Sequence, residues 1–272
     1  MGGLPKLDIS TDLASAEIYL HGGHVTRFHP RHQKHPVLWM SQFSQFQPDK
    51  PIRGGIPICF PWFGPKTDDP KAPSHGYGRL AQWQLESAIQ RPDGTAIVGF
   101  GWRYDDLQLT YIVTIGKSLE VALRVRNRGS NPARYEVALH SYFTVSDVRK
   151  IEVHGLRGTS YLDRLQPGQR FVQNDRQIRF TEETDRTYVN TEAAVTVSDP
   201  GLARRVVNRK TGSRSTVVWN PWIEKSKAMP DFGDDEWPTM VCIETANAGE
   251  NAITLQPGEE HETRALIETE DL

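Results

Sequence analysis

The 272-residue sequence predicts an all-β protein, built as one large antiparallel β-sandwich. Three observations lead to this prediction. Apolar residues recur with a period of two along most of the chain, turn-forming residues separate the apolar runs, and only one short segment carries the start signal of a helix. A chain of this length can fill the core of a single large sandwich. Because no linker, composition break or internal repeat divides it, we expect one domain over residues 1–272.

The clearest strand begins at Leu119. Leu119, Val121 and every second residue after them share one face, while charged residues occupy the other, which is typical of a strand with one side in the core. The preceding run, Leu107–Ile115, should join it through Gly116-Lys117 as a two-residue hairpin loop. The other expected strands are Ala16–Leu20, Trp83–Ile89, Ala96–Trp102, Tyr135–Val145, Ile151–His154, Ala194–Ser198, Arg205–Asn208, Thr216–Trp219, Met240–Glu244 and Thr263–Glu268.

Turns and one helix are expected between these strands. The helix should begin after Asn220, because Pro221 suits the first helical position. The strongest turn signals are Pro92-Asp93-Gly94, Gly129-Ser130-Asn131, Thr211-Gly212 and Pro257-Gly258.

The composition excludes several classes of function. A net charge of −2 provides no overall field that would attract nucleic acid or an anionic membrane. Cys59 and Cys242 both lie in apolar runs, as expected for buried free thiols. No secretory signal follows Met1, and no apolar run approaches the length of a membrane span. We therefore expect a cytoplasmic monomer with neither a nucleic-acid nor a membrane partner.

The segment between Arg53 and Arg79 combines unusual residues. It reads RGGIPICFPWFGPKTDDPKAPSHGYGR, so two arginines enclose prolines, glycines and aromatic residues, and His75 lies near the second arginine. Prolines stiffen such a loop, and glycines let the backbone approach other groups closely. This pattern favours a loop that binds a polar, ring-shaped, anionic ligand. The alternative is a proline-rich connection whose aromatic side chains fill the core.

Two ionisable residues lie in otherwise apolar strands. His140 should share a strand face with Ala138 and Tyr142, and Glu244 ends the apolar run 240–243. An ionised carboxylate is costly to bury without partners, so Glu244 is either paired or has a raised pKa. The alternatives are a hydrogen-bonded core histidine and a glutamate that faces solvent at the end of its strand.

Three further polar residues are open to more than one interpretation. Asp185 lies in the run TDRTY and could bind a ligand or stabilise a turn through its own backbone. Asp163 has a similar but weaker signal. Lys225 follows the run WNPWIE, where a solvated helical lysine is the simplest explanation.

No metal or cofactor is expected. Five histidines crowd residues 21–35, but no cysteine or aspartate accompanies them there. The sequence also lacks a phosphate-binding Gly-x4-Gly-Lys-Ser/Thr loop, a dinucleotide-binding fingerprint, a Gly-x-Ser-x-Gly elbow and a His-Glu-x-x-His motif.

Taken together, these motifs resemble the aldose 1-epimerase (mutarotase) superfamily, in particular its glucose-6-phosphate 1-epimerase branch. The resemblance extends from about residue 18 to residue 257 and implies a large antiparallel β-sandwich of the galactose mutarotase type. The chain departs from the family pattern at His261, where an aromatic residue is more common. The runs that carry the resemblance are RGGIPICFPWFG (53–64), HGYGR (75–79), LHSYF (139–143), TDRTY (184–188), WNPW with Lys225, and VCIE (241–244).

The resemblance implies an isomerase that interconverts the α and β anomers of hexose 6-phosphates, chiefly glucose 6-phosphate. His140 would be the general acid and Glu244 the general base, on opposite sides of the C1–O5 unit, while His75 and Asp185 would hold sugar hydroxyls. Opening and closing the ring changes no oxidation state, so an imidazole and a carboxylate suffice. The alternatives are a mutarotase for unphosphorylated aldoses and a sugar-binding module without activity.

The arginines are a separate part of the prediction. Arg53 and Arg79 present planar forks that suit phosphate oxygens, so we expect them to bind the 6-phosphate. The alternative is that they brace the loop through ion pairs with nearby acids such as Asp68 or Asp69.

Overall fold

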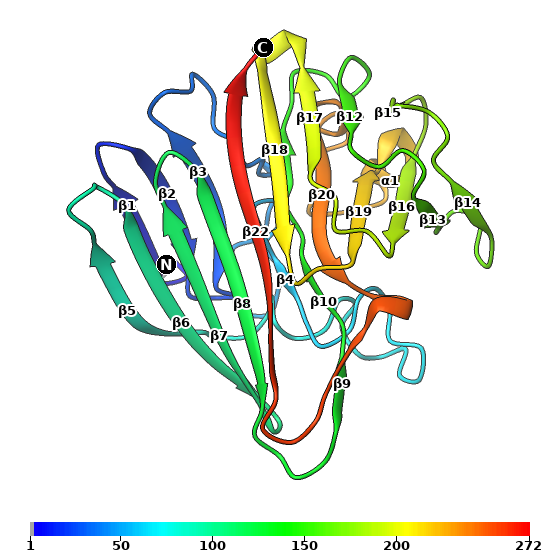
Figure 1. The fold of residues 1–272 in the computed structure, drawn as a ribbon. Helices are drawn as coiled ribbons and strands as arrows, with labels where there is room; N and C mark the ends of the chain where they lie inside the picture. The colour runs from blue at the N-terminus through cyan, green and yellow to red at the C-terminus, as the bar shows by residue number, and fades with distance from the viewer. Residues whose placement is uncertain (1–2) are drawn as a thin grey trace.

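The computed structural model describes residues 3–272, and its elements form a predominantly antiparallel β-architecture (Figure 1). A three-stranded sheet contains β1 (Lys6–Ser10), β2 (Ala14–Tyr19) and β3 (His24–Pro30). An eight-stranded sheet has the order β14 (Arg170–Val172), β13 (Ser160–Asp163), β16 (Thr184–Val189), β19 (Ser215–Asn220), β20 (Met240–Asn247), β10 (Val137–Leu139) and β4 (Ile58–Cys59), with β11 (Tyr142–Thr144) also paired to β20.

A nine-stranded sheet forms the other large layer. Its order is β15 (Gln177–Ile178), β12 (Glu152–His154), β17 (Val195–Asp199), β18 (Arg204–Thr211), β22 (Glu260–Asp271), β8 (Leu119–Asn127), β7 (Leu107–Ile115), β6 (Ala96–Tyr104) and β5 (Gln84–Gln90). The remaining elements are the pair β9 (Ala133–Tyr135) and β21 (Ile253–Leu255), the helix α1 (Trp222–Lys227), and the 3₁₀ turns η1 (Pro200–Leu202), η2 (Trp237–Thr239) and η3 (Gly249–Asn251).

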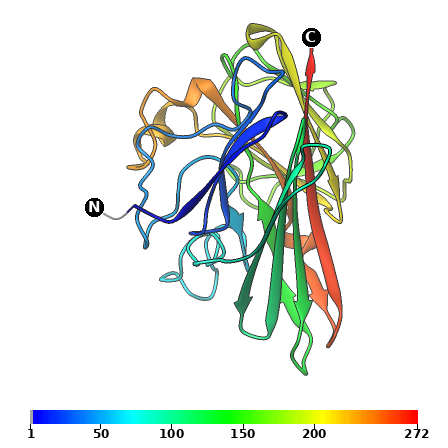
Figure 2. The same cartoon turned by 90° about the vertical axis from the view of Figure 1, so that its left-hand side faces the viewer.

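The two large sheets meet where β22 contacts β20. Asn208 on β18 donates a hydrogen bond to the backbone carbonyl of Ile243 on β20 (3.2 Å). The other part of the nine-stranded sheet lies against the small N-terminal sheet, whose β2 contacts β7; Figure 2 shows this sheet in blue beside the long green strands. Ile18 on β2 and Tyr111 on β7 are fully buried between them. Burial of alternate strand residues in this core is the main stabilising term of the fold.

The predicted fold class is confirmed. The helix follows Asn220 as expected, but it begins at Trp222, so that Pro221 is its N-cap rather than its first residue. Two other local predictions were wrong. Residues 116–118, rather than 116–117, join β7 to β8, because Ile115 pairs with Leu119. The expected strand 135–145 is divided among β9, β10 and β11. Within residues 3–272, no helix has the length and hydropathy that a membrane span requires.

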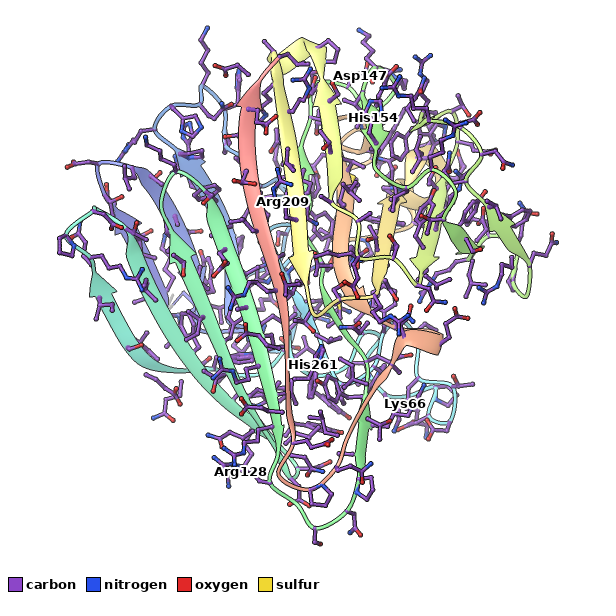
Figure 3. The ribbon with its side chains drawn as sticks, in the orientation of Figure 1. Lys66, Arg128, Asp147, His154, Arg209 and His261 are labelled. Carbon is purple, nitrogen blue, oxygen red and sulfur yellow. The ribbon has the colours of Figure 1, made fainter. Side chains whose placement is uncertain are left out.

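His261, where the sequence departs from the family pattern, has a structural role on β22 (Figure 3). Its Nε2 hydrogen bonds to the backbone carbonyl of Gly212 (2.7 Å). This contact ties β22 to the turn between β18 and β19.

Arg204 should be one of the most important single residues for stability. Its guanidinium donates to the carbonyls of His35, Pro36 and Thr144 at 2.9–3.0 Å, and the side chain is 1 % exposed. Arg204→Ala leaves these carbonyls without their charged donor, so the free energy of unfolding should fall by about 3 kcal/mol. The partly exposed neighbour Arg205 is the matched control, and chemical denaturation of Arg205→Ala should show a change within about 0.5 kcal/mol. A similarly small change for Arg204→Ala would contradict this role.

Candidate active site

The register of three neighbouring strands places Asp185, Trp219 and Glu244 on one face of the eight-stranded sheet. Asp185 on β16 pairs with Trp219 on β19. Two residues earlier on β19, Val217 pairs with Glu244 on β20. Residues opposite one another, and residues two apart, share a face of an antiparallel sheet. The pairing therefore brings together side chains from distant parts of the sequence.

His140 reaches the same face because its strand is interrupted. It lies between β10 and β11, and the Ser141 N–H bonds to the Leu139 carbonyl (3.0 Å) in a tight local turn. Both flanking strands pair with β20. As a result, His140 Nε2 lies 3.2 Å from Glu244 Oε1. The two groups are therefore direct neighbours, whereas the sequence predicted that they lie on opposite sides of the ligand.

His75 comes from the loop between the two arginines. Its backbone is left-handed (φ 65°), followed by Gly76 at φ 72°. A Cβ at Gly76 would lie 2.1 Å from the Phe60 carbonyl oxygen, so only glycine fits this approach. The Gly64 N–H donates to His75 Nδ1 (3.3 Å). Because Nδ1 accepts, the neutral ring carries its proton on Nε2 and can donate from there.

These side chains line one cavity of about 310 Å³, a volume suited to a small ligand. Other cavities of about 320, 630, 660 and 670 Å³ lie elsewhere, but the histidine–carboxylate pair is in this smaller one. The lining residues of the smaller cavity are Arg53, Phe63, Gly64, Pro65, Ser74, His75, Arg79, His140, Arg164, Asp185, Trp219, Lys225, Met229 and Glu244.

The His140–Glu244 pair is almost completely removed from solvent: His140 is 7 % exposed and Glu244 is 1 % exposed. Burial, assisted by the negative charge of Asp185, raises the pKa of Glu244 well above its usual value. Burial and the charges of Arg53 and Arg79 lower the pKa of His140 well below its usual value. Glu244 Oε2 and His140 Nδ1 have no hydrogen-bond partner among the described residues. Unpaired buried polar atoms in residues that line a cavity favour a functional role over a structural one.

The other two predicted sugar contacts also titrate abnormally. Burial, followed by the charge of Arg79, lowers the pKa of His75 well below its usual value, so the ring is neutral at pH 7. Burial raises the pKa of Asp185 to about 6, although Arg164 opposes this shift. His75 and Asp185 can therefore offer a neutral donor and a carboxylate acceptor to the same ligand.

Three arginines and Lys225 line the cavity, and Arg79 is the least compensated of the arginines. It donates to the Ser74 carbonyl (2.7 Å) and has no carboxylate partner within residues 3–272. Its Nε is buried without a hydrogen-bond partner in the part of the chain that the structure describes. Burial, together with the charge of Arg53, lowers its pKa. A partly buried cation without a carboxylate partner among the described residues is costly, so this position favours an anionic ligand.

Arg53 differs from Arg79 because its guanidinium group already binds other side chains of the protein. Nε and Nη2 each donate to Asp231 (3.2 Å), and Nη1 donates to the Tyr142 hydroxyl (3.0 Å). An ion pair was one of the alternatives for Arg53, but the partner is Asp231 rather than Asp68 or Asp69.

The structure also settles which other residues border the cavity. Lys225 lines it, whereas Asp163 does not; Asp163 instead accepts a hydrogen bond from the Leu165 N–H (3.0 Å). Sequence reasoning missed Arg164, whose guanidinium lies 4.5 Å from the centre of the Phe63 ring and whose Nε is 3.9 Å from Asp185 Oδ1. Only the pairing of β13 with β16 brings it to the site, and the sequence gives no sign of that pairing.

The N-terminal histidines do not gather around a common point. His21 and His24 hydrogen bond separately to the carbonyls of Lys50 (2.8 Å) and Gly54 (2.7 Å). Among residues 3–272, no group of three or more His, Cys, Asp or Glu side chains is placed to hold a metal ion. The expectation of a reaction without metal or cofactor stays a prediction.

Asp185 should make stability depend on pH. Its pKa is about 6 in the native protein and about 4 in an unfolded chain, so the native state binds the proton more tightly between these values. Its contribution to the free energy of unfolding therefore falls as the pH rises from about 4 to about 6. Asp185→Asn should have a higher Tm than wild type at pH 7.5, and this difference should vanish near pH 4.

Asp147 provides a control, because its substitution should change the Tm at pH 7.5 in the opposite direction. The Arg149 fork lowers the pKa of Asp147, so its ionised form stabilises the native state at neutral pH. Asp147→Asn should therefore lower the Tm at pH 7.5. A lower Tm for Asp185→Asn at the same pH would show that Asp185 is mainly a structural residue.

Known proteins share the sequence pattern and the fold of this chain. The sequence matches the aldose 1-epimerase family over residues 5–268. Relatives provisionally named glucose-6-phosphate 1-epimerase occur in Cenchrus ciliaris (36 % identical over 270 residues, 93 % of this chain and 80 % of the relative) and in Escherichia coli K12 (32 % over 244 residues, 86 % and 80 %). A crystal structure from Salmonella typhimurium, provisionally named a mutarotase, superposes with a TM-score of 0.92 at 27 % identity, covering 100 % of this chain and 92 % of the other. The chain belongs to the aldose 1-epimerase family.

Proposed function

We propose that the protein interconverts the α and β anomers of hexose 6-phosphates, chiefly glucose 6-phosphate. The observation that carries this proposal is a buried acid–base pair, His140 and Glu244, in one small cavity with the uncompensated cation Arg79. The pair suits proton transfer at C1, and the cation suits a phosphate on the same ligand.

The arrangement of the pair fits ring opening. The C1 hydroxyl loses a proton and the ring oxygen O5 gains one, and both oxygens are attached to the same carbon. An acid and a base in contact with each other can therefore serve both atoms at once. In opening, Glu244 takes the C1 hydroxyl proton while His140 protonates O5, and the C1–O5 bond breaks to give the aldehyde. Rotation about C1–C2 followed by the reverse transfers gives the other anomer.

The opposing pKa shifts support this role. Burial disfavours both imidazolium and carboxylate, so the pKa of His140 falls and the pKa of Glu244 rises, which brings the two values toward one another. In either proton arrangement the pair holds one proton and has no net charge. Opening and closing require the proton to move in opposite directions, and such a pair can supply both.

Other cavity residues would hold the sugar. His75 would donate from Nε2 to a ring hydroxyl, and Asp185 would accept from another. Trp219 and Phe63 supply apolar faces on which the ring carbons can pack. These contacts would fix C1 against the acid–base pair, which lowers the entropic part of the barrier.

The phosphate would be held mainly by Arg79. Arg164 and Lys225 line the same cavity and add positive charge. Arg53 was expected to share the phosphate with Arg79, but its contacts with Asp231 and Tyr142 leave it less free to do so. We therefore assign the phosphate to the cavity cations other than Arg53.

The proposal is tested by comparing kcat/KM for anomer exchange of glucose 6-phosphate and of glucose, both measured by NMR exchange spectroscopy. We expect glucose 6-phosphate to be preferred by at least tenfold, and rising salt to reduce the preference. Equal values, or a preference for glucose, would instead indicate a mutarotase for unphosphorylated aldoses. Binding without exchange for either sugar would indicate a sugar-binding module.

A further inference from the structure

The guanidinium group of Arg53 links the loop that carries Asp231 to the His140–Glu244 pair. Asp231 holds it by two hydrogen bonds of 3.2 Å, and the remaining terminal nitrogen donates to the Tyr142 hydroxyl (3.0 Å). The ion pair is sheltered from solvent, since the Arg53 and Asp231 side chains are 18 % and 13 % exposed. A bidentate contact fixes the plane of the guanidinium, and with it the position of the Tyr142 hydroxyl.

Tyr142 in turn lies flat against the His140 ring. The two ring centres are 4.7 Å apart and the planes differ by only 11°. Trp39 stacks on Tyr142 with ring centres 5.9 Å apart, and Trp219 meets the His140 ring edge-on. The plane of the His140 imidazole is thus set by a tyrosine whose own orientation is set by Arg53 and Asp231.

The loop that carries Asp231 is itself firmly held. Glu236 accepts hydrogen bonds from the Ser41 hydroxyl (2.7 Å) and the Gln42 N–H (2.8 Å), and Phe232 packs against Trp39 at 5.0 Å between ring centres. These contacts place Asp231 on a rigid support, which a residue that orients another must have.

We propose that Asp231, acting through Arg53 and Tyr142, is a positioning residue that holds the His140 imidazole in line with Glu244 and balances the positive charge beside it. This inference rests on the proposed function of the site. It also gives Arg53 a different role from the phosphate ligand expected from the sequence.

The charges near the His140 ring determine how the loss of Asp231 would change its pKa. Arg53, Arg79 and Arg164 all act to lower its pKa, and Asp231 neutralises the first of them. Loss of the Asp231 charge leaves Arg53 uncompensated, which disfavours imidazolium and favours carboxylate, so the apparent pKa values of the pair should fall. The titratable and charged groups around the pair are Arg53, Arg79, Arg164, Lys225, His75, Tyr142, Asp185, Cys59 and Cys242.

The test compares Asp231→Asn and Tyr142→Phe with the control Asp147→Asn. Asp147 also forms a two-bond contact with an arginine, Arg149 (both 2.8 Å), and Figure 3 shows it at the end of the molecule where β12 lies. Asp231→Asn should lower kcat by about tenfold to a hundredfold for glucose 6-phosphate and glucose alike, because it misaligns the proton-transfer groups. Its pH–kcat profile should shift to lower pH, whereas Asp147→Asn should match wild type.

Two further variants separate positioning from folding. Tyr142→Phe keeps the stacked ring and loses only the hydroxyl, so it should fold normally and lose part of kcat. Asp231→Glu keeps the charge and should recover the wild-type pH profile while regaining only part of kcat. The His140 ring signals, followed by NMR through a pH titration, should show a lower pKa in Asp231→Asn independently of any activity.

Three outcomes decide the inference. A rise in KM for glucose 6-phosphate alone, with kcat unchanged, would mean that the Arg53 unit serves the phosphate. A lower Tm with unchanged kcat, pH profile and His140 titration would mean that Asp231 only braces the loop. Either result overturns the inference. Absence of exchange in the wild-type protein would overturn the proposed function instead, and the His140 titration would still report whether Asp231 controls this histidine.

Discussion

Glu244→Gln should abolish most anomer exchange, with a loss on the order of 10²-fold or more for glucose 6-phosphate and for glucose. An amide cannot take the C1 hydroxyl proton, although its size and its contact with His140 are retained. Because the chemical step is affected, the loss should appear in kcat rather than in KM. His140→Asn should show a similar loss. The two losses should not add in the double variant, because the groups act as a unit.

The same substitution should not weaken the fold. Glu244 Oε2 is buried without a hydrogen-bond partner among residues 3–272, and burial raises the pKa of the carboxyl. Because the pKa of Glu244 is higher in the native state than in the unfolded chain, ionisation of this carboxyl lowers the stability of the fold once the pH rises above its unfolded-state pKa. The neutral amide avoids this cost, so the Tm at pH 7.5 should equal or exceed that of wild type. Glu120→Gln, on the partly exposed face of β8, is the matched control and should exchange normally. Near-normal exchange by Glu244→Gln would remove the proposed base.

Arg79→Ala should lower kcat/KM for glucose 6-phosphate far more than for glucose. The phosphate lies several bonds from C1 and its charge barely changes along the reaction, so the contact contributes mainly to binding and should appear in KM. Loss of a charge-assisted contact in a mostly buried site costs about 2–4 kcal/mol, or roughly 30-fold to 10³-fold. Arg79→Lys should recover only part of this, because an ammonium group lacks the planar fork.

The comparison must include both sugars, since Arg79 also donates to the Ser74 carbonyl within its own loop. Equal losses on glucose and glucose 6-phosphate would mean that Arg79 only braces the loop. The phosphate preference would then have to come from Arg164 and Lys225, and the corresponding double variant would be the next one to measure.

The sequence was sufficient to predict the fold class and to single out the ionisable residues that lie in apolar strands. Alternation was unambiguous in β7 and β8, whose faces are set by local pattern alone. His140 and Glu244 stood out because charge is costly in such runs. The register that puts them 3.2 Å apart involves strands about a hundred residues apart along the chain, and alternation carries no information about which strands pair.

The remaining features depend on contacts that no local pattern encodes. The sequence suggests Asp68 or Asp69 as ion-pair partners of Arg53 because they are close along the chain. The actual partner, Asp231, is 178 residues away. Arg164 enters the cavity only because β13 pairs with β16. The break in the strand at His140 was also hidden, because the apolar alternation continues through it. Tertiary pairing with β20 on both sides of the break decides the local conformation there.

The proposed function is catalysis, by this chain, of ring opening of a hexose 6-phosphate. The most direct measurement is two-dimensional ¹³C exchange NMR of [1-¹³C]glucose 6-phosphate with catalytic amounts of the wild-type protein. At a mixing time too short for spontaneous mutarotation, we expect cross-peaks between the α and β C1 signals, growing with protein concentration and absent with Glu244→Gln. No cross-peaks above the buffer control at any protein concentration would contradict the account.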